Sequence, residues 1–171
     1  MEKRYRYLRD MLYAALIAAM YTALTHLQNI LVPGSATWAI QFRASEALCI
    51  LAFFTPAAIP GLTVGCFLFN LTYAAALPLD ILVGSLATAL SCGSMYLTRN
   101  MKLKGIPVLG LAMPAVWNAL LVGWELTVYI GGMFWINAVY VAIGEAAVLG
   151  TLGVLIYTAM KKRNLDSRLF G

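Results

Sequence analysis

The sequence predicts an all-α integral membrane protein that crosses the bilayer six times as a single unit, residues 1–171. Of these residues 62% are hydrophobic and 11% are charged, whereas soluble domains average about 45–50% and about 25%. The mean hydropathy of +0.82 agrees with this composition. Since a spanning helix needs about 20 apolar residues, the length provides for about six helices with short loops and leaves no room for a separate soluble domain.

Turn-forming segments separate the first three expected helices. The first, Leu8–Leu31, follows the basic start MEKRYRYLRD. This start resembles a signal peptide, but no clean cleavage site follows the long apolar run and more spans come after it, so we expect a membrane helix. The second helix, Trp38–Phe54, ends at the turn TPAAIPG, which contains two prolines. The third, Ile59–Tyr73, is short.

The last three expected helices lie on either side of one basic loop. The fourth, Asp80–Leu97, follows the connection AAALPLD and leads into the polar loop RNMKLKG. The fifth, Pro107–Ile130, ends at two consecutive glycines, which interrupt a helix. The sixth is Phe134–Met160.

Basic residues indicate how the chain is oriented, because cytoplasmic loops carry an excess of lysine and arginine. All basic residues except Arg43 lie in three clusters, one at each end of the chain and one in RNMKLKG. With six spans, all three clusters and both termini fall on the cytoplasmic side. Five spans, with residues 38–73 as one broken helix, would move two clusters outside, which the rule disfavours. The net charge of +5 therefore reflects topology and not a nucleic-acid surface.

Polar side chains within the expected helices gather toward the outer side of the membrane. We assign each polar residue a depth by counting about 1.5 Å of rise per helical residue. The residues placed in this way are His26, Gln28, Asn29, Gln41, Arg43, Glu46, Asn70, Tyr73, Asp80, Asn118, Glu125, Trp135, Asn137 and Tyr140. Glu145 lies about 16 Å into the sixth helix, near the membrane midplane. Ionisable groups at this depth cost about 2.5–3.5 kcal/mol and mark functional sites by default. The set predicts an outward-facing ligand site whose excess of carboxylates favours a cationic or donor-rich ligand.

Several of these charged residues also have structural interpretations that the sequence leaves open. Arg43 and Glu46, three residues apart, can pair with each other instead of contacting a ligand. Asp80 fits a helix N-cap, and Glu125 fits the solvated headgroup region. Glu145 is the hardest to explain structurally, because no basic residue lies near it in the sequence.

Aromatic residues and the single histidine allow two interpretations as well. Trp38, Trp117, Trp124 and Trp135 can form flat walls for a ring-shaped ligand, or anchor the helices at the membrane interface. His26, near a helix end, fits a hydrogen-bonded structural residue better than a ligand contact.

Small residues recur every fourth position in the first expected helix. Ala15, Ala19 and Ala23 form one row, and Ala14, Ala18 and Thr22 form the adjacent row. Such rows let helices approach closely in lipid. The face they form can pack on another helix of this chain or on a partner protein.

Motifs for nucleotide binding and for catalysis are absent from the sequence. It contains no GxxxxGK[ST], no HExxH and no GxSxG. One histidine and three isolated cysteines provide no pattern for a metal site. We therefore expect a binding subunit without enzyme activity, metal or cofactor, which takes its energy from elsewhere.

Three stretches, QFRASEAL, FFTPAAIPGLTVGCFLFN and LDILVGSLATAL, resemble the substrate-binding S components of energy-coupling factor (ECF) transporters, and among them the QueT family, assigned to queuosine precursors. The resemblance covers nearly the whole chain and is most specific over residues 41–90. It implies the six-helix S-component fold in a prokaryotic plasma membrane, with a membrane T subunit and two cytoplasmic ATPases as partners. It also implies that the alanine-rich face docks on the T subunit and that the loop LVPGSATW covers the ligand.

The resemblance further implies a 7-deazaguanine ligand such as preQ1 or preQ0. Glu145 and Asn118 are then expected to accept hydrogen bonds from the donor edge of the ring, while Arg43 and Glu46 line the pocket or hold each other. The other residues expected at the ligand are Asn70, Asn137, Trp135, Tyr140, Trp117 and Gln41.

Two other classes of function compete with this expectation. The first is a stand-alone secondary permease for a purine-like or vitamin-like molecule. The second is an intramembrane enzyme that uses Glu46 and Glu145 as acid and base. The missing metal ligands and nucleophile disfavour the enzyme.

Overall fold

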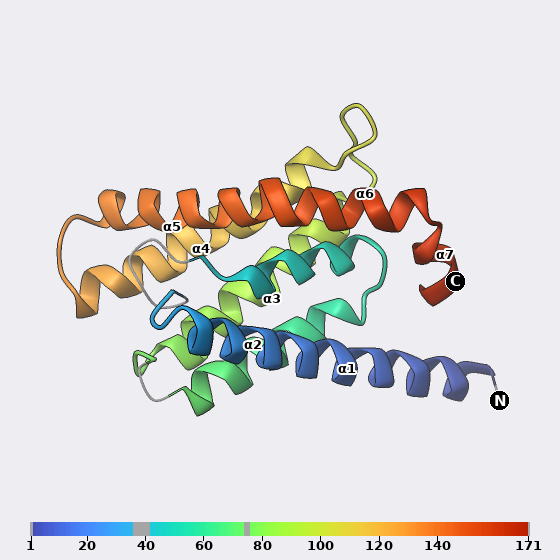
Figure 1. The fold of residues 1–171 in the computed structure, drawn as a ribbon, viewed down its shortest axis with the longest axis horizontal. Helices are drawn as coiled ribbons and strands as arrows, with labels where there is room; N and C mark the ends of the chain where they lie inside the picture. Colours follow the sequence, from blue (N-terminus) through green and yellow to red (C-terminus); the bar gives the residue numbers. More distant parts are fainter. Residues whose placement is uncertain (1, 36–41, 74–75, 171) are drawn as a thin grey trace.

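The computed structural model describes residues 2–35, 42–73 and 76–170, and these residues fold into a bundle of helices (Figure 1). The elements in chain order are α1 (Glu2–Leu31), η1 (Ala44–Phe53), α2 (Ala58–Thr72), α3 (Asp80–Thr98), α4 (Val108–Tyr129), α5 (Phe134–Val148), η2 (Leu149–Gly153), α6 (Val154–Lys162) and α7 (Leu165–Phe170). The all-helical prediction is confirmed for the described residues.

Within the described part of the chain, four helical stretches are long and apolar enough to cross a membrane. They are Lys3–Leu31, Asp80–Thr98, Val108–Tyr129 and Phe134–Lys162. The last combines α5, η2 and α6 into one continuous rod, as the sequence predicted for its sixth helix. The expected second and third spans correspond to two shorter apolar helices, η1 and α2, so their crossing of the membrane stays a prediction.

The short element η1 lies at the centre of the bundle, where it contacts α1, α2, α3, α5, α6 and η2. It is a 3₁₀ helix, which rises about 2.0 Å per residue and is therefore longer than an α-helix of equal residue count. The expected start at Trp38 lies outside the described residues. Phe42 and Arg43 precede the helix, and Arg43 has an extended backbone, so the prediction that both are helical is wrong.

Glycines allow the closest helix contacts in the bundle. A Cβ added to Gly61 would lie 2.8 Å from the carbonyl oxygen of Ala14, and one added to Gly65 would lie 3.0 Å from that of Ala18. These distances bring α2 against α1 with no side chain between them. A glycine also allows close contact between α4 and α5: a Cβ on Gly123 would lie 2.8 Å from the Cα of Ala138.

Both chain termini lie at the same end of the bundle (Figure 1). There α7 turns back onto α1: the hydroxyl of Tyr13 donates to the carbonyl oxygen of Leu169 at 2.5 Å, and its ring packs edge-on against Phe170. Lys161 donates to Asp166 at 2.5 Å, and this hydrogen bond lowers the pKa of the exposed Asp166 carboxyl. The turn between α4 and α5 lies at the opposite end (Figure 1).

Candidate functional site

A set of buried polar side chains occupies the half of the bundle away from the termini, and we call it the polar cluster. Its members come from α1, the η1 region, α2, α3, α4 and α5: Tyr21, Thr25, Asn29, Arg43, Ser45, Glu46, Asn70, Asp80, Asn118, Glu125 and Glu145. The helices that the sequence predicted to contribute polar groups therefore do bring many of them together.

The carboxylate of Glu46 is held on both sides. The Tyr21 hydroxyl donates to its Oε1 at 2.5 Å, and the Cys49 thiol donates to its Oε2 at 3.2 Å. Next to this group, Thr25 donates to the hydroxyl of Ser45 at 2.7 Å. These contacts fasten η1 to α1 and fix the position of Glu46.

The junction that leads into η1 is held by one amide side chain. Gln28 accepts from the backbone N–H of Ala44 at 2.7 Å and donates to the hydroxyl of Ser35 at 2.8 Å and to the carbonyl oxygen of Phe42. The backbone N–H of Phe42 in turn donates to the carbonyl oxygen of Ser35 at 3.0 Å. Because Gln28 bonds to the backbone of Phe42 and of Ala44, it fixes Arg43, which lies between them, at the start of η1.

Arg43 is the buried cation of the polar cluster, with 4% of its surface exposed. Its guanidinium lies 6.0 Å from the ring centroid of Phe69 and interacts electrostatically with Asp80 and Glu46. The sequence left open whether Arg43 and Glu46 pair only with each other. Both are buried in a larger network, in which Glu46 also binds Tyr21.

Asn118 and Glu145 meet directly in the middle of the bundle. The amide of Asn118, on α4, donates to Oε1 of Glu145, on α5, at 2.9 Å. Both side chains are buried. Among the described residues, Oε2 of Glu145 has no hydrogen-bond partner, so this carboxylate presents an unused acceptor.

The first turn of α3 holds a second acidic group. Asp80 accepts from the backbone N–H of Leu77 at 2.8 Å, and Asn70 donates to the Asp80 carbonyl oxygen at 2.8 Å. The N-cap of α3 is Leu79, so Asp80 is the first helical residue and not the predicted N-cap. It steadies the preceding turn instead.

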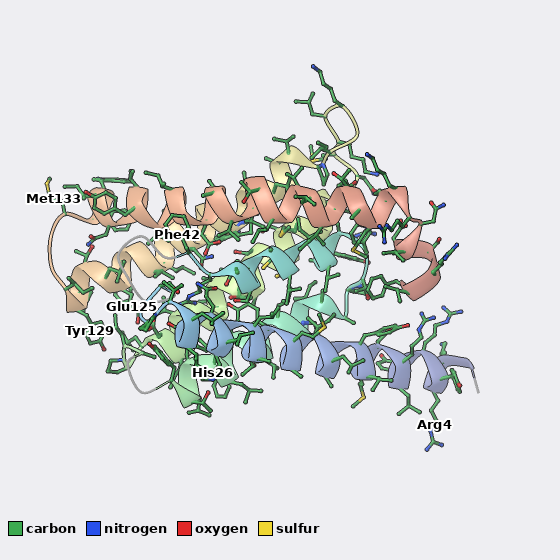
Figure 2. All side chains as sticks on the ribbon, in the orientation of Figure 1. Arg4, His26, Phe42, Glu125, Tyr129 and Met133 are labelled. Atoms are coloured by element: carbon green, nitrogen blue, oxygen red, sulfur yellow. The ribbon has the colours of Figure 1, made fainter. Side chains whose placement is uncertain are left out.

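Glu125 is fully buried, so its interpretation as a solvated headgroup residue is wrong. It lies close enough to Asp80 and Arg43 for their charges to interact. Both of its carboxylate oxygens lack a hydrogen-bond partner among the described residues. Packing of α4 against α3 and α5 turns Glu125 into the bundle (Figure 2), whereas its depth alone suggested the surface.

The polar cluster is strongly acidic and rich in unused acceptors. Its buried carboxylates are Glu46, Asp80, Glu125 and Glu145, and its buried guanidinium is that of Arg43. The side-chain oxygens without a partner among the described residues include those of Glu125, Glu145, Asn29 and Asn70. Because a buried acceptor without a donor costs about 1–3 kcal/mol, this arrangement suits a ligand that brings several donors.

Four residues expected at the ligand lie outside the polar cluster. Trp135 is 70% exposed and Tyr140 is 41% exposed, because their side of α5 faces outward. Asn137 donates to the hydroxyl of Thr127 and to the carbonyl oxygen of Gly131, which fastens the turn between α4 and α5. Trp117 donates to Ser94 of α3 at 3.0 Å, and neither residue is a member of the cluster. The position of these residues along their helices follows from counting, whereas the packing of the helices decides the direction in which they face.

Two further expectations concern residues near the cluster. Gln41 lies outside the described residues. His26 bonds to the hydroxyl of Thr72 at 2.9 Å and packs edge-on against Phe69, which confirms the structural interpretation of this histidine.

The two alanine rows of α1 face in different directions. Ala14 is half-buried and Ala18 is buried, and both pack on the glycines of α2, so they lie against another helix of this chain. Thr22, in the same row, donates to the carbonyl oxygen of Gly65 at 3.0 Å. The row of Ala15, Ala19 and Ala23 is exposed.

Sequence reasoning included Asn29 in the polar set but missed Tyr21 and Thr25, which α1 also contributes to the polar cluster. Tyr21, Thr25 and Asn29 are buried and follow one another at intervals of four residues. Residues four apart share one face of a helix. From this spacing a polar stripe on the same face of α1 as Ala18 could have been predicted.

Comparison with known proteins gives a family for this chain. A family model described as QueT transporter matches residues 11–162. The Queuosine precursor transporter QueT of Lactococcus lactis subsp. cremoris (strain MG1363) is 35% identical over 95 residues, which are 53% of this chain and 52% of the relative. The chain thus spans about half the length of that curated relative. No solved structure matches the chain. Because the family match runs from α1 to the end of α6, this membrane protein belongs to the QueT transporter family, whose members are transporters and not enzymes.

Proposed function

We propose that this protein is the substrate-binding component of an ECF transporter and captures a queuosine precursor, a 7-deazaguanine base, from outside the cell. The polar cluster supports this proposal most directly, because it gathers buried acceptors that suit the N–H and NH₂ donors of a guanine-like edge. The relative from Lactococcus lactis is named as a queuosine precursor transporter, which supports the same class of ligand.

Glu145 and Asn118 are the residues that we assign to the donor edge of the base. They already share a hydrogen bond of 2.9 Å, so Asn118 orients the carboxylate, and Oε2 of Glu145 offers an acceptor to the ligand. Arg43 and Glu46 shape the wall of the site from η1, where Tyr21 and Cys49 hold Glu46 in place.

Energy for uptake would come from partner subunits. The sequence contains no nucleotide-binding motif, which supports coupling to an ECF module with a T subunit and two ATPases. We assign the exposed row Ala15, Ala19 and Ala23 to docking on the T subunit, since small residues let membrane helices approach closely. In this proposal the chain crosses the membrane six times, with both termini in the cytoplasm. The membrane is the plasma membrane of a prokaryote.

Ligand titration of the purified protein tests the binding site. Wild-type protein is expected to bind preQ1, preQ0 or queuine and to bind guanine more weakly. Glu145→Gln should lower the affinity at least tenfold, about 1.4 kcal/mol, because an amide N–H₂ then faces the ligand donors. Tyr140→Phe, on the exposed side of the same helix, is the matched control and should bind within twofold of wild type. Unchanged affinity in Glu145→Gln removes that residue from the site.

Uptake into vesicles separates this proposal from a stand-alone permease. We expect uptake only when the T subunit and ATPases are reconstituted with the protein and ATP is present. Uptake by this chain alone would establish the permease instead.

A further inference from the structure

Glu125 is the buried carboxylate that the proposed contacts to the base leave unused. Its side chain is fully buried on α4, and neither of its oxygens has a hydrogen-bond partner among the described residues. Figure 2 shows Glu125 in the half of the bundle far from the termini, which is also the half that holds the polar cluster.

A second carboxylate faces Glu125 from the neighbouring helix. Asp80, at the start of α3, is buried with 4% of its surface exposed, and its charge interacts with that of Glu125. One oxygen of Asp80 is held by the backbone N–H of Leu77. Like charges in a buried site repel each other, so a cation between Asp80 and Glu125 would stabilise both.

The charge balance leaves room for such a cation. Among the described residues four buried carboxylates share the polar cluster with one buried arginine. Arg43 interacts with Asp80, Glu46, Glu125 and Glu145. A single guanidinium carries one positive charge and can neutralise at most one of the four carboxylates when they are ionised, whatever contacts it makes.

The position of Glu125 relative to Asn118 suits a ligand with two polar ends. The two residues are seven positions apart on α4, which is about two turns or 10 Å along the axis, and they share one face. Asn118, the earlier of the two residues on α4, donates a hydrogen bond to Glu145. If the donor edge of a bicyclic base lies at Asn118 and Glu145, a substituent on the opposite side of the base would point toward Glu125.

We propose that Glu125, together with Asp80, forms an ammonium-binding subsite of the ligand site, so that the protein selects a base with a primary amine arm over one with a neutral arm. This inference rests on the proposed function and adds to it the charge class of the ligand. The amine would donate to both carboxylates, and charge-assisted hydrogen bonds of this kind are about twice as strong as neutral ones.

Calorimetric titration with two probes tests the subsite on the full-length protein in detergent. The probes are 7-aminomethyl-7-deazaguanine, whose arm is a cation, and 7-cyano-7-deazaguanine, whose arm is neutral; the ring is the same in both. Wild-type protein should bind the aminomethyl base at least tenfold more tightly. Glu125→Gln should weaken binding of the aminomethyl base at least tenfold and change binding of the cyano base less than twofold.

Two results would overturn the subsite: equal affinities of the two probes for the wild-type protein, or an equal loss of both in Glu125→Gln. Thermal unfolding shows whether the variant is folded. Should it not fold, Asp80→Asn replaces it, because an asparagine oxygen can still accept from Leu77, and the same loss confined to the aminomethyl base is expected. Discrimination by the wild-type protein tests the proposal even without a variant.

The outcomes also separate this inference from the proposed function. If the wild-type protein binds neither probe and does not bind queuine, the proposed function itself fails. If it binds both probes equally and Glu145→Gln weakens both, the proposed function stands and the ammonium subsite is wrong.

Discussion

A buried carboxylate needs donors for its oxygens, and Glu46 shows how this chain provides them. Tyr21 from α1 and Cys49 from η1 donate to its two oxygens. Neither donor is a cation, so the contacts position Glu46 without neutralising it. Glu145, by contrast, has a donor on one oxygen only, from Asn118. This difference separates a carboxylate that supports the site from one that we assign to the ligand.

Replacing Tyr21 by phenylalanine tests how much its hydrogen bond to Glu46 contributes to the stability of the protein. Tyr21→Phe removes the donor to Oε1 of Glu46 and leaves a buried acceptor unpaired, which should cost about 1–3 kcal/mol of the free energy of unfolding. The midpoint of thermal unfolding in detergent measures the loss. Tyr129→Phe, on the exposed surface of α4, is the control and should change the free energy by less than about 0.5 kcal/mol. Equal midpoints for the two variants would contradict the role given to Tyr21.

At the scale of elements, α1 and α2 are held together by backbone contact. Gly61 and Gly65 lie against Ala14 and Ala18. Association of helices in lipid depends on close packing, because both lipid and side chains are apolar. The contact also decides which face of α1 turns inward, and so brings Tyr21 to Glu46.

A methyl group at Gly65 should therefore destabilise the protein. In Gly65→Ala the new Cβ would lie 2.8 Å from the Cβ of Tyr21 and 3.0 Å from the carbonyl oxygen of Ala18. Overpacking of this kind costs about 1–3 kcal/mol. Gly93→Ala is the matched control, because a Cβ there meets nothing within 4 Å, and alanine favours a helix over glycine by up to about 1 kcal/mol. A drop in the thermal midpoint for Gly65→Ala, with none for Gly93→Ala, is the expected result.

For the whole molecule, the distribution of charge separates the two ends of the bundle. Both termini, with their clusters of lysine and arginine, lie at one end, and the turn between α4 and α5 lies at the other (Figure 1). Under the positive-inside rule we expect the basic end to be cytoplasmic. The proposed ligand site then opens toward the exterior, as capture of an external ligand requires.

Cysteine labelling in intact cells tests this orientation. Met133→Cys, in the exposed turn between α4 and α5, should react with a membrane-impermeant maleimide added outside. Lys102→Cys, in the exposed loop between α3 and α4, should react only after permeabilisation. The natural residues Cys49, Cys66 and Cys92 are buried, so they should give little background. Labelling of Lys102→Cys in intact cells would reverse the assigned topology.

The sequence by itself determined the membrane class, the order of the helices and the position of each polar residue along its helix. Position along a helix follows from counting, because each helical residue advances the chain by a fixed rise. For Glu145 and Asn118 this was sufficient: both were expected close to each other, and they share a hydrogen bond.

Only the tertiary structure decided which way each side chain faces. In a soluble protein the apolar stripe marks the inward face of a helix, but in a membrane helix lipid-facing and protein-facing sides are both apolar. For this reason Glu125 turned out to be buried while Trp135 and Tyr140 face outward. The same ambiguity hid the contribution of Tyr21, because its direction depends on the glycines of α2 that pack against α1.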